Sequence, residues 1–159
     1  MRSEVDDKKK GVVQYFLDSE EEKMYLRDYV PTFDDFLDWE QTKESSWFAV
    51  KKYKDSLYRG EIDPETAKRS GRGVITYNSK RIYEGEWVAD KRHGNGFERF
   101  ANGNEYFGQY KEGKVHGQGK YRWNNGMEYE GQFRQGMKHG YGVWKGLQNE
   151  EYVGEWKNN

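Results

Sequence analysis

The chain of 159 residues has no cysteine, two prolines and few aliphatic side chains. The absence of cysteine excludes disulfides, thiolate zinc sites and cysteine nucleophiles. No apolar run approaches the roughly 18 residues that a membrane-spanning helix needs, and residues 1–10 lack the apolar stretch of a secretory signal. The formal net charge of −1 gives no reason to expect a nucleic-acid partner. These absences predict a soluble, cytoplasmic protein that binds no nucleic acid.

Aromatic rings and glycine are abundant instead. Hydrophobic residues make up only 33% of the chain, yet aromatic residues make up 17% and glycine occurs 19 times. A core with so few aliphatic side chains has to be built mainly from rings. Charge is distributed unevenly, because residues 1–57 carry more acids than bases and residues 58–159 more bases than acids. The two segments are therefore expected either to dock on each other or to face different partners.

One five-residue block recurs every 23 residues. It consists of an aromatic residue, any residue, a glycine, a polar residue that is Glu or Gln, and a second aromatic residue. The copies begin at Tyr83, Tyr106, Tyr129 and Tyr152. A second motif, His-Gly-x-Gly, follows at His93, His116 and His139. A period of this length indicates a repeat architecture in which each unit is one supersecondary element.

Alternation within a unit predicts a β-hairpin. Tyr83, Gly85 and Trp87 fall on one face of a strand, and the residues between them on the other. A loop over residues 89–93 then leads into a second strand over 94–100, and Asn-Gly, as at Asn125–Gly126, is typical of a two-residue hairpin turn. Successive hairpins would add side by side into one sheet. The glycine between two rings is expected to leave a socket in which a ring from the adjacent strand lies flat.

The repeats predict two domains. Residues 58–159 form the sheet, with an atypical unit over 58–82, units over 83–105, 106–128 and 129–151, and a partial unit over 152–159. Residues 1–57 form an α-helical extension or cap. Its helix signals are a capping box at Ser19–Glu22, a break at Pro31 and an apolar helix face of Phe33, Phe36 and Leu37. Residues 47–50 fit either a third short helix or a strand.

The two motifs resemble those of the MORN (membrane occupation and recognition nexus) repeat, whose pattern is roughly Y-x-G-x-W-x-x-G-x-x-H-G-x-G. The likeness is close over residues 83–156 and loose over 58–82. Asp90 stands at the mid-unit glycine, and Tyr110 and Phe133 stand at the tryptophan position. The resemblance implies a mainly β protein, an elongated single-layer antiparallel sheet of stacked hairpins with an aromatic-lined groove. It suggests ciliary and cytoskeletal complexes, membrane contacts and accessory modules of lipid kinases as settings.

The residues give no reason to expect an enzyme, a cofactor or a metal. Equivalent histidines two strands apart lie about 10 Å from each other, whereas zinc ligands lie about 2 Å from the metal. Gly108–Val115 imitates a phosphate-binding loop, but Val115 replaces the Ser or Thr that would meet Mg²⁺. No serine, acid and histidine form a nucleophile–base arrangement.

We therefore expect a non-catalytic scaffold or adaptor, a structural subunit of a cytoskeletal, ciliary or organellar complex. Its aromatic groove would hold a helix or an extended segment, either from a partner or from the chain's own Phe33, Phe36 and Leu37. The groove residues are Tyr83, Trp87, Tyr106, Tyr110, Tyr129, Phe133, Tyr152 and Trp156. The strand over residues 151–156 would be an edge strand, which predicts a homodimer through that end.

The alternative is a peripheral membrane tether. Basic residues gather just before the histidines, at Lys91, Arg92, Lys114 and Lys138. Such residues would bind phosphoinositide headgroups at about 1 kcal/mol each near an anionic bilayer. Solubilising turn charge explains the same residues without a ligand, and acids interrupt the series.

Overall fold

The computed structural model describes residues 45–158, which form ten β-strands and no helix. The predicted N-terminal helices, with Phe33, Phe36 and Leu37, lie outside the described residues. None of the described residues belongs to a helix that could cross a membrane. The chain divides into two compact parts, which join between Lys91 and Arg92. The prediction of a mainly β protein made of hairpins is confirmed.

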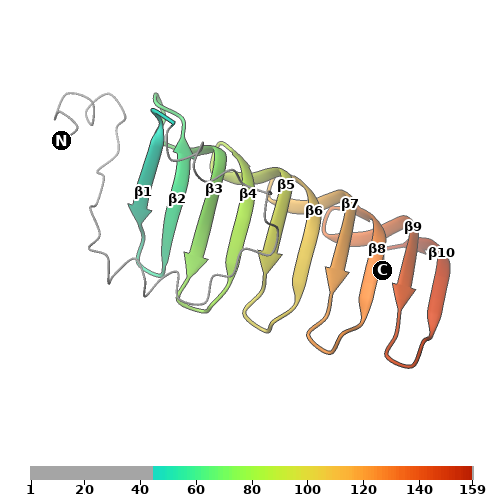
Figure 1. The fold of residues 1–159 in the computed structure, drawn as a ribbon. Helices are drawn as coiled ribbons and strands as arrows, with labels where there is room; N and C mark the ends of the chain where they lie inside the picture. Colours follow the sequence, from blue (N-terminus) through green and yellow to red (C-terminus); the bar gives the residue numbers. More distant parts are fainter. Residues whose placement is uncertain (1–44, 159) are drawn as a thin grey trace. The chain divides into compact units, whose positions relative to one another are not determined.

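The first part is an antiparallel sheet whose strands pair in sequence order (Figure 1). Its strands are β1 (Phe48–Lys52), β2 (Ser56–Ile62), β3 (Arg69–Tyr77) and β4 (Ile82–Val88). Because every strand pairs with the next one in the sequence, all the connections are hairpins.

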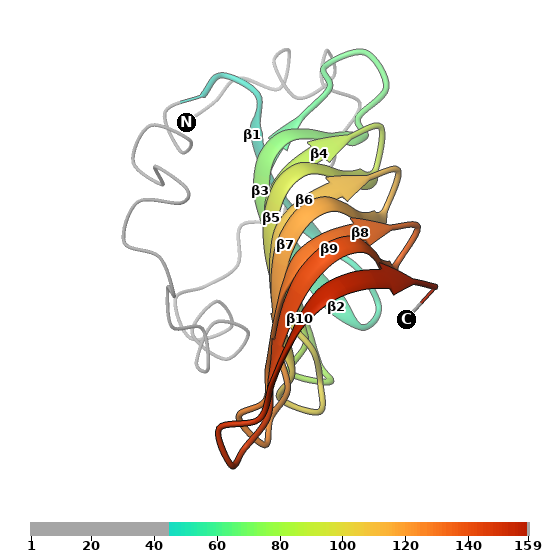
Figure 2. The ribbon, with the colours of Figure 1, turned by 90° about the vertical axis from the view of Figure 1, so that its right-hand side faces the viewer.

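The second part follows the same rule with the 23-residue repeat. Its strands are β5 (Lys91–Arg99), β6 (Glu105–Lys111), β7 (Lys114–Arg122), β8 (Glu128–Arg134), β9 (Met137–Lys145) and β10 (Glu151–Lys157). Seen from the side in Figure 2, these strands bend along their length.

The segment at residues 47–50, for which helix and strand were both open, contributes to strand β1, so the helical alternative is wrong. Ala49 lies opposite Gly60 and is buried, whereas Lys52 at the end of the strand is exposed. Pairing with β2 satisfies the backbone of this short run, which is too short for a stable helix of its own. The sheet therefore begins at Phe48, within the residues assigned to a helical extension.

The turns after β4, β6 and β8 are shorter than the predicted loop. Only Glu112 and Gly113 separate β6 from β7, and both have positive φ, 50° and 87°. This is a type I′ turn, whose twist matches that of the strands. The histidines consequently lie on strands β5, β7 and β9 rather than in loops.

The connection at Asn102–Gly103 is not the two-residue hairpin turn that the sequence predicts for Asn-Gly. Gly103 has φ of 86°, and its amide donates to the Phe100 carbonyl. The φ of Asn102 is not positive. Only the glycine is left-handed, so the connection is a type I turn closed by a left-handed residue. Asn-Gly alone does not distinguish these two turn classes.

A β-bulge recurs at the same place in the hairpins. The register shifts after Gly60, Gly108 and Gly131. The side chain that follows the glycine closes the bulge: Gln109 Oε1 accepts from the Gln118 amide at 2.9 Å, and Gln132 Oε1 from the Tyr141 amide at 3.0 Å. A bulge bends its strand, which accounts for the bends seen in Figure 2.

Candidate functional site

In the units that begin at Tyr58, Tyr106 and Tyr129, the first ring lies over a glycine of the next strand, as the socket prediction requires. The hydroxyl of Tyr129 donates to the Gln132 carbonyl of its own strand at 2.9 Å. The ring then lies above Gly142 of the next strand, where an added methyl group would come within 2.5 Å of ring atom Cε2. Tyr106 makes the same bond to Gln109 and lies over Gly119. Glycine is therefore required in the following strand because the ring occupies the space of a side chain.

The second ring of each repeat packs edge-on against the first. The Tyr106 centroid lies 5.2 Å from those of Tyr110 and Phe133, with interplanar angles of 89° and 90°. Tyr129 contacts Phe133 and Trp156 in the same way at 5.1 and 5.3 Å. Such T-shaped pairs contribute about 0.5–1.5 kcal/mol each beyond the area that they bury. We call the sheet face that carries these rings the ring face.

Most of the rings predicted to line a groove are buried. Their relative exposures are 0% for Tyr83, 3% for Trp87, 0% for Tyr106, 4% for Tyr110, 0% for Tyr129 and 6% for Phe133, whereas Tyr152 is 48% exposed and Trp156 intermediate. These six rings have little area left for a partner because they pack on one another and on glycine. Their role in binding stays a prediction, and the structure shows them as the core of each part.

Two of the four predicted anion contacts are turned toward the rings. Lys138 Nζ lies 4.8 Å from the ring centroid of Trp123, 5.4 Å from that of Tyr129 and 4.7 Å from that of Trp156. Burial lowers the pKa of this lysine. Arg92 lies 3.3 Å from the buried Glu98. Lys91 and Lys114 are exposed, and the lipid-binding role of all four stays a prediction.

The sequence analysis did not predict that cations before the second motif contact the rings. In the first part, Arg69 stacks 4.4 Å from the Trp87 ring centroid and pairs with Asp90 at 2.9 Å. Burial opposes ionisation of Asp90, but hydrogen bonds from the Arg69 amide and guanidinium, with the guanidinium charge, hold its pKa below the usual value. The signal was in the sequence. The residue before the Ser or His is a cation in three units, at Arg69, Arg92 and Lys138. In the remaining unit it is Val115, which lies opposite Tyr110 in the register.

Glu98 was also missed. It stands where the next unit has Tyr121, faces the rings and is 1% exposed. Its Oε2 accepts from the Tyr110 hydroxyl at 2.8 Å and pairs with Arg92. A buried carboxylate needs such partners, and they explain why the next unit has Tyr110 at the tryptophan position.

The opposite face of the second part carries ordered charge. Glu105 pairs with Arg99 at 3.1 Å, and Glu128 pairs with both Arg122 and Lys120 at 3.0 Å. The hydrogen bond from Lys120 is the largest cause that holds the pKa of Glu128 below its usual value. These ion pairs occupy the strand ends near the Asn-Gly turns. We call this surface the polar face.

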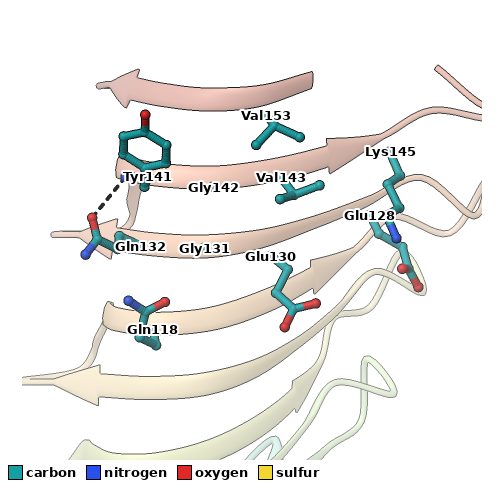
Figure 3. Close-up of a pocket in the computed structure, with 10 residues that line it drawn as sticks. All are labelled: Gln118, Glu128, Glu130, Gly131, Gln132, Tyr141, Gly142, Val143, Lys145 and Val153. Atoms are coloured by element: carbon teal, nitrogen blue, oxygen red, sulfur yellow. Dashed lines mark hydrogen bonds between the residues drawn. The ribbon is translucent and has the colours of Figure 1, made fainter. Parts of the chain in front are cut away.

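A hollow of about 430 Å³ opens on the polar face over strands β7 to β10 (Figure 3). We call it the β8–β9 hollow. Backbone at Gly131 and Gly142 forms its floor. Its lining side chains are Gln118, Gln132 and Tyr141 on one side of the glycines, and Glu128, Glu130, Val143, Lys145 and Val153 on the other.

The hollow combines apolar and hydrogen-bonding groups. Tyr141 is 63% exposed and Val153 is 59% exposed, and Val143 pairs with Val153 in the register. Gln132 uses its carbonyl oxygen for the bulge, and its amide nitrogen has no partner among residues 45–158, so that it can donate to a ligand. Among residues 45–158 no group of three or more metal-ligating side chains is placed to hold an ion. The hollow thus offers apolar contact area beside hydrogen-bonding side chains.

Comparison with known families identifies the repeats. The model of the MORN repeat matches four consecutive segments, residues 83–105, 106–128, 129–146 and 152–159. Comparison with curated proteins gives no match. The chain therefore contains four consecutive MORN repeats between residues 83 and 159.

Proposed function

We propose that the protein is a non-catalytic scaffold that binds a protein segment in the β8–β9 hollow. MORN repeats are modules that bind proteins or membranes and are not themselves enzymes. The observation that carries the proposal is the contrast between the two faces of the second part. The ring face hides Tyr106, Tyr110, Tyr129 and Phe133, whereas the polar face exposes Tyr141 on strand β9.

The position of Tyr141 makes its exposure informative. Strand β9 is paired on both sides, with β8 and with β10, so the exposure does not result from a missing neighbour. Val143 is two residues further along the same face, and Val153 is beside it. Adjoining exposed apolar side chains with a polar rim mark interaction sites. Tyrosine also offers a large contact area at a small entropy cost.

A membrane role is the second proposal, and it has less support. Arg92 and Lys138 are engaged with Glu98 and with rings, which leaves Lys91 and Lys114 as the exposed members of the predicted set. Two cations near an anionic bilayer contribute about 2 kcal/mol, which is weak for stable attachment. Sedimentation with phosphoinositide vesicles at low salt measures this directly.

Selection from a random peptide library tests the scaffold proposal. The purified full chain would be used to select twelve-residue peptides, which would then be measured against Tyr141→Ser and Leu147→Ser. Leu147 is the matched control, since it is 62% exposed and lies in the turn between β9 and β10. The selected peptides should bind the Tyr141→Ser variant more weakly than the natural chain. They should bind the Leu147→Ser variant as tightly as the natural chain. Failure to select any peptide, or equal binding to both variants, would refute the proposal.

A further inference from the structure

Within residues 45–158, the acids around the β8–β9 hollow differ in whether they form ion pairs. Glu128 is paired with Lys120 and Arg122, and Figure 3 shows Lys145 pointing toward it. Glu130, by contrast, is exposed and forms no ion pair within residues 45–158. Glu130 lies opposite Val143 in the register of β8 and β9 and opposite Lys120 in the register of β7 and β8, and Figure 3 shows its carboxylate directed toward β7. The hollow therefore presents one available carboxylate next to its apolar side chains.

A second acid, Glu155, adds negative charge beside the hollow. Glu155 lies opposite Tyr141 in the register of β9 and β10 and is exposed. Tyr141 and Val143 are thus each flanked by an acid on a neighbouring strand. Nearby charges of one sign favour a ligand of the other sign and disfavour an acidic or phosphorylated one.

The size of the hollow limits what it can hold. A volume of about 430 Å³ is near the lower end of the range of small-molecule pockets. It accommodates a few side chains, and a helix, at about 10–12 Å across, would stand over it rather than enter it. An extended segment suits the geometry better, since its alternate side chains have the same spacing as Tyr141 and Val143 on strand β9.

From these observations we propose that the segment bound in the hollow is extended and inserts an arginine or lysine side chain between Tyr141 and Val143 so that its charge meets Glu130. The apolar stem of the basic side chain lies along Val143 and Val153. An arginine guanidinium can also stack on the Tyr141 ring and bond the carboxylate with two donors. The free amide groups of Gln118 and Gln132 bond the backbone of the segment. This inference rests on the proposed scaffold function.

The test uses peptides selected on the full chain from the random twelve-residue library. Each selected peptide is synthesised, and its dissociation constant is measured for the natural chain, Glu130→Gln and Glu112→Gln. Glu112 is the matched control because it is exposed and lies in the turn between β6 and β7. We expect a basic residue with apolar residues two positions away, and an affinity about tenfold lower on Glu130→Gln, with no change on Glu112→Gln.

A second peptide with glutamine in place of the basic residue makes the test specific. Its affinity should also fall about tenfold on the natural chain, and Glu130→Gln should then cause no further loss, because both changes remove one contact. Peptides that need Tyr141 but contain no basic residue would overturn this inference and leave the scaffold proposal standing. Peptides whose affinity is unchanged by Tyr141→Ser and by Glu130→Gln would overturn both the inference and the scaffold proposal. Failure to select any peptide would do the same.

Discussion

The substitution Gly119→Ala tests how the ring face is held together. Gly119 has an ordinary backbone conformation, so alanine is not strained by φ. On conformational grounds alone the change should stabilise the protein by about 0.4–1 kcal/mol. The added methyl group, however, would lie 2.6 Å from Cε2 and 2.7 Å from Cζ of Tyr106. The sign of the effect therefore separates the two explanations.

The expected loss follows from what Tyr106 contacts. The ring is fully buried between Tyr110 and Phe133, so it has no solvent-exposed side to move into. Overpacking of this kind costs about 1–3 kcal/mol. If the ring moves, its hydroxyl also loses the bond to the Gln109 carbonyl, which is worth about 0.5–1.5 kcal/mol. After the conformational gain is subtracted, we expect a net loss of about 1–4 kcal/mol in the free energy of unfolding.

Urea unfolding followed by circular dichroism measures the loss, and amide hydrogen exchange on β6 and β7 shows whether it is local. Exchange is needed because repeat proteins can unfold in stages. Gly113→Asn is the control, since no atom lies within 4 Å of an added Cβ there and asparagine tolerates its φ of 87°. Tyr106→Phe isolates the hydroxyl at about 1 kcal/mol. A Gly119→Ala protein as stable as the natural chain would refute the socket account.

Three further changes follow from the same structure. Arg92→Met should lower the free energy of unfolding by about 3 kcal/mol, since it removes a cation paired with the buried Glu98; urea unfolding measures it, and a neutral result would contradict it. Gln132→Ala should cost about 1 kcal/mol because the Tyr141 amide loses its acceptor, and faster exchange of that amide would show it. Because its pKa is lowered, Asp90 stabilises the fold above its unfolded pKa near 3.8, an effect lost as pH falls through the folded value. Asp90→Asn should therefore flatten the stability profile in acid, and an unchanged profile would count against the Arg69–Asp90 pair.

The sequence alone was enough to predict the hairpins and the alternation of rings. A period of 23 residues with Gly between aromatic residues allows few other solutions, and Tyr129 over Gly142 is the packing that this pattern implies. Turn class was less accessible, because Glu112–Gly113 and Asn102–Gly103 differ in which residues take positive φ. Strand β1 was ambiguous because five residues satisfy both periodicities equally well.

The candidate site was beyond the reach of sequence reasoning for a physical reason. Alternation assigns Tyr129 and Tyr141 to opposite faces but does not say which face is open. The ring face closes because each tyrosine reaches the carbonyl three residues ahead in its own strand, as Tyr129 reaches Gln132. In the sequence, Tyr141 occupies the variable position of the His-Gly-x-Gly motif, which gives no sign of a binding role. Its exposure in the folded sheet is what makes it a candidate contact residue.

The most direct test of this account is an NMR titration of the labelled full chain with a selected peptide. We predict that the largest shift changes fall on Gln118, Gln132, Tyr141 and Val143 of the β8–β9 hollow, while the ring signals of Tyr106 and Tyr129 stay in place. Changes centred on Tyr106, Tyr110 and Tyr129, with Tyr141 unaffected, would show that partners bind the ring face and would contradict the account.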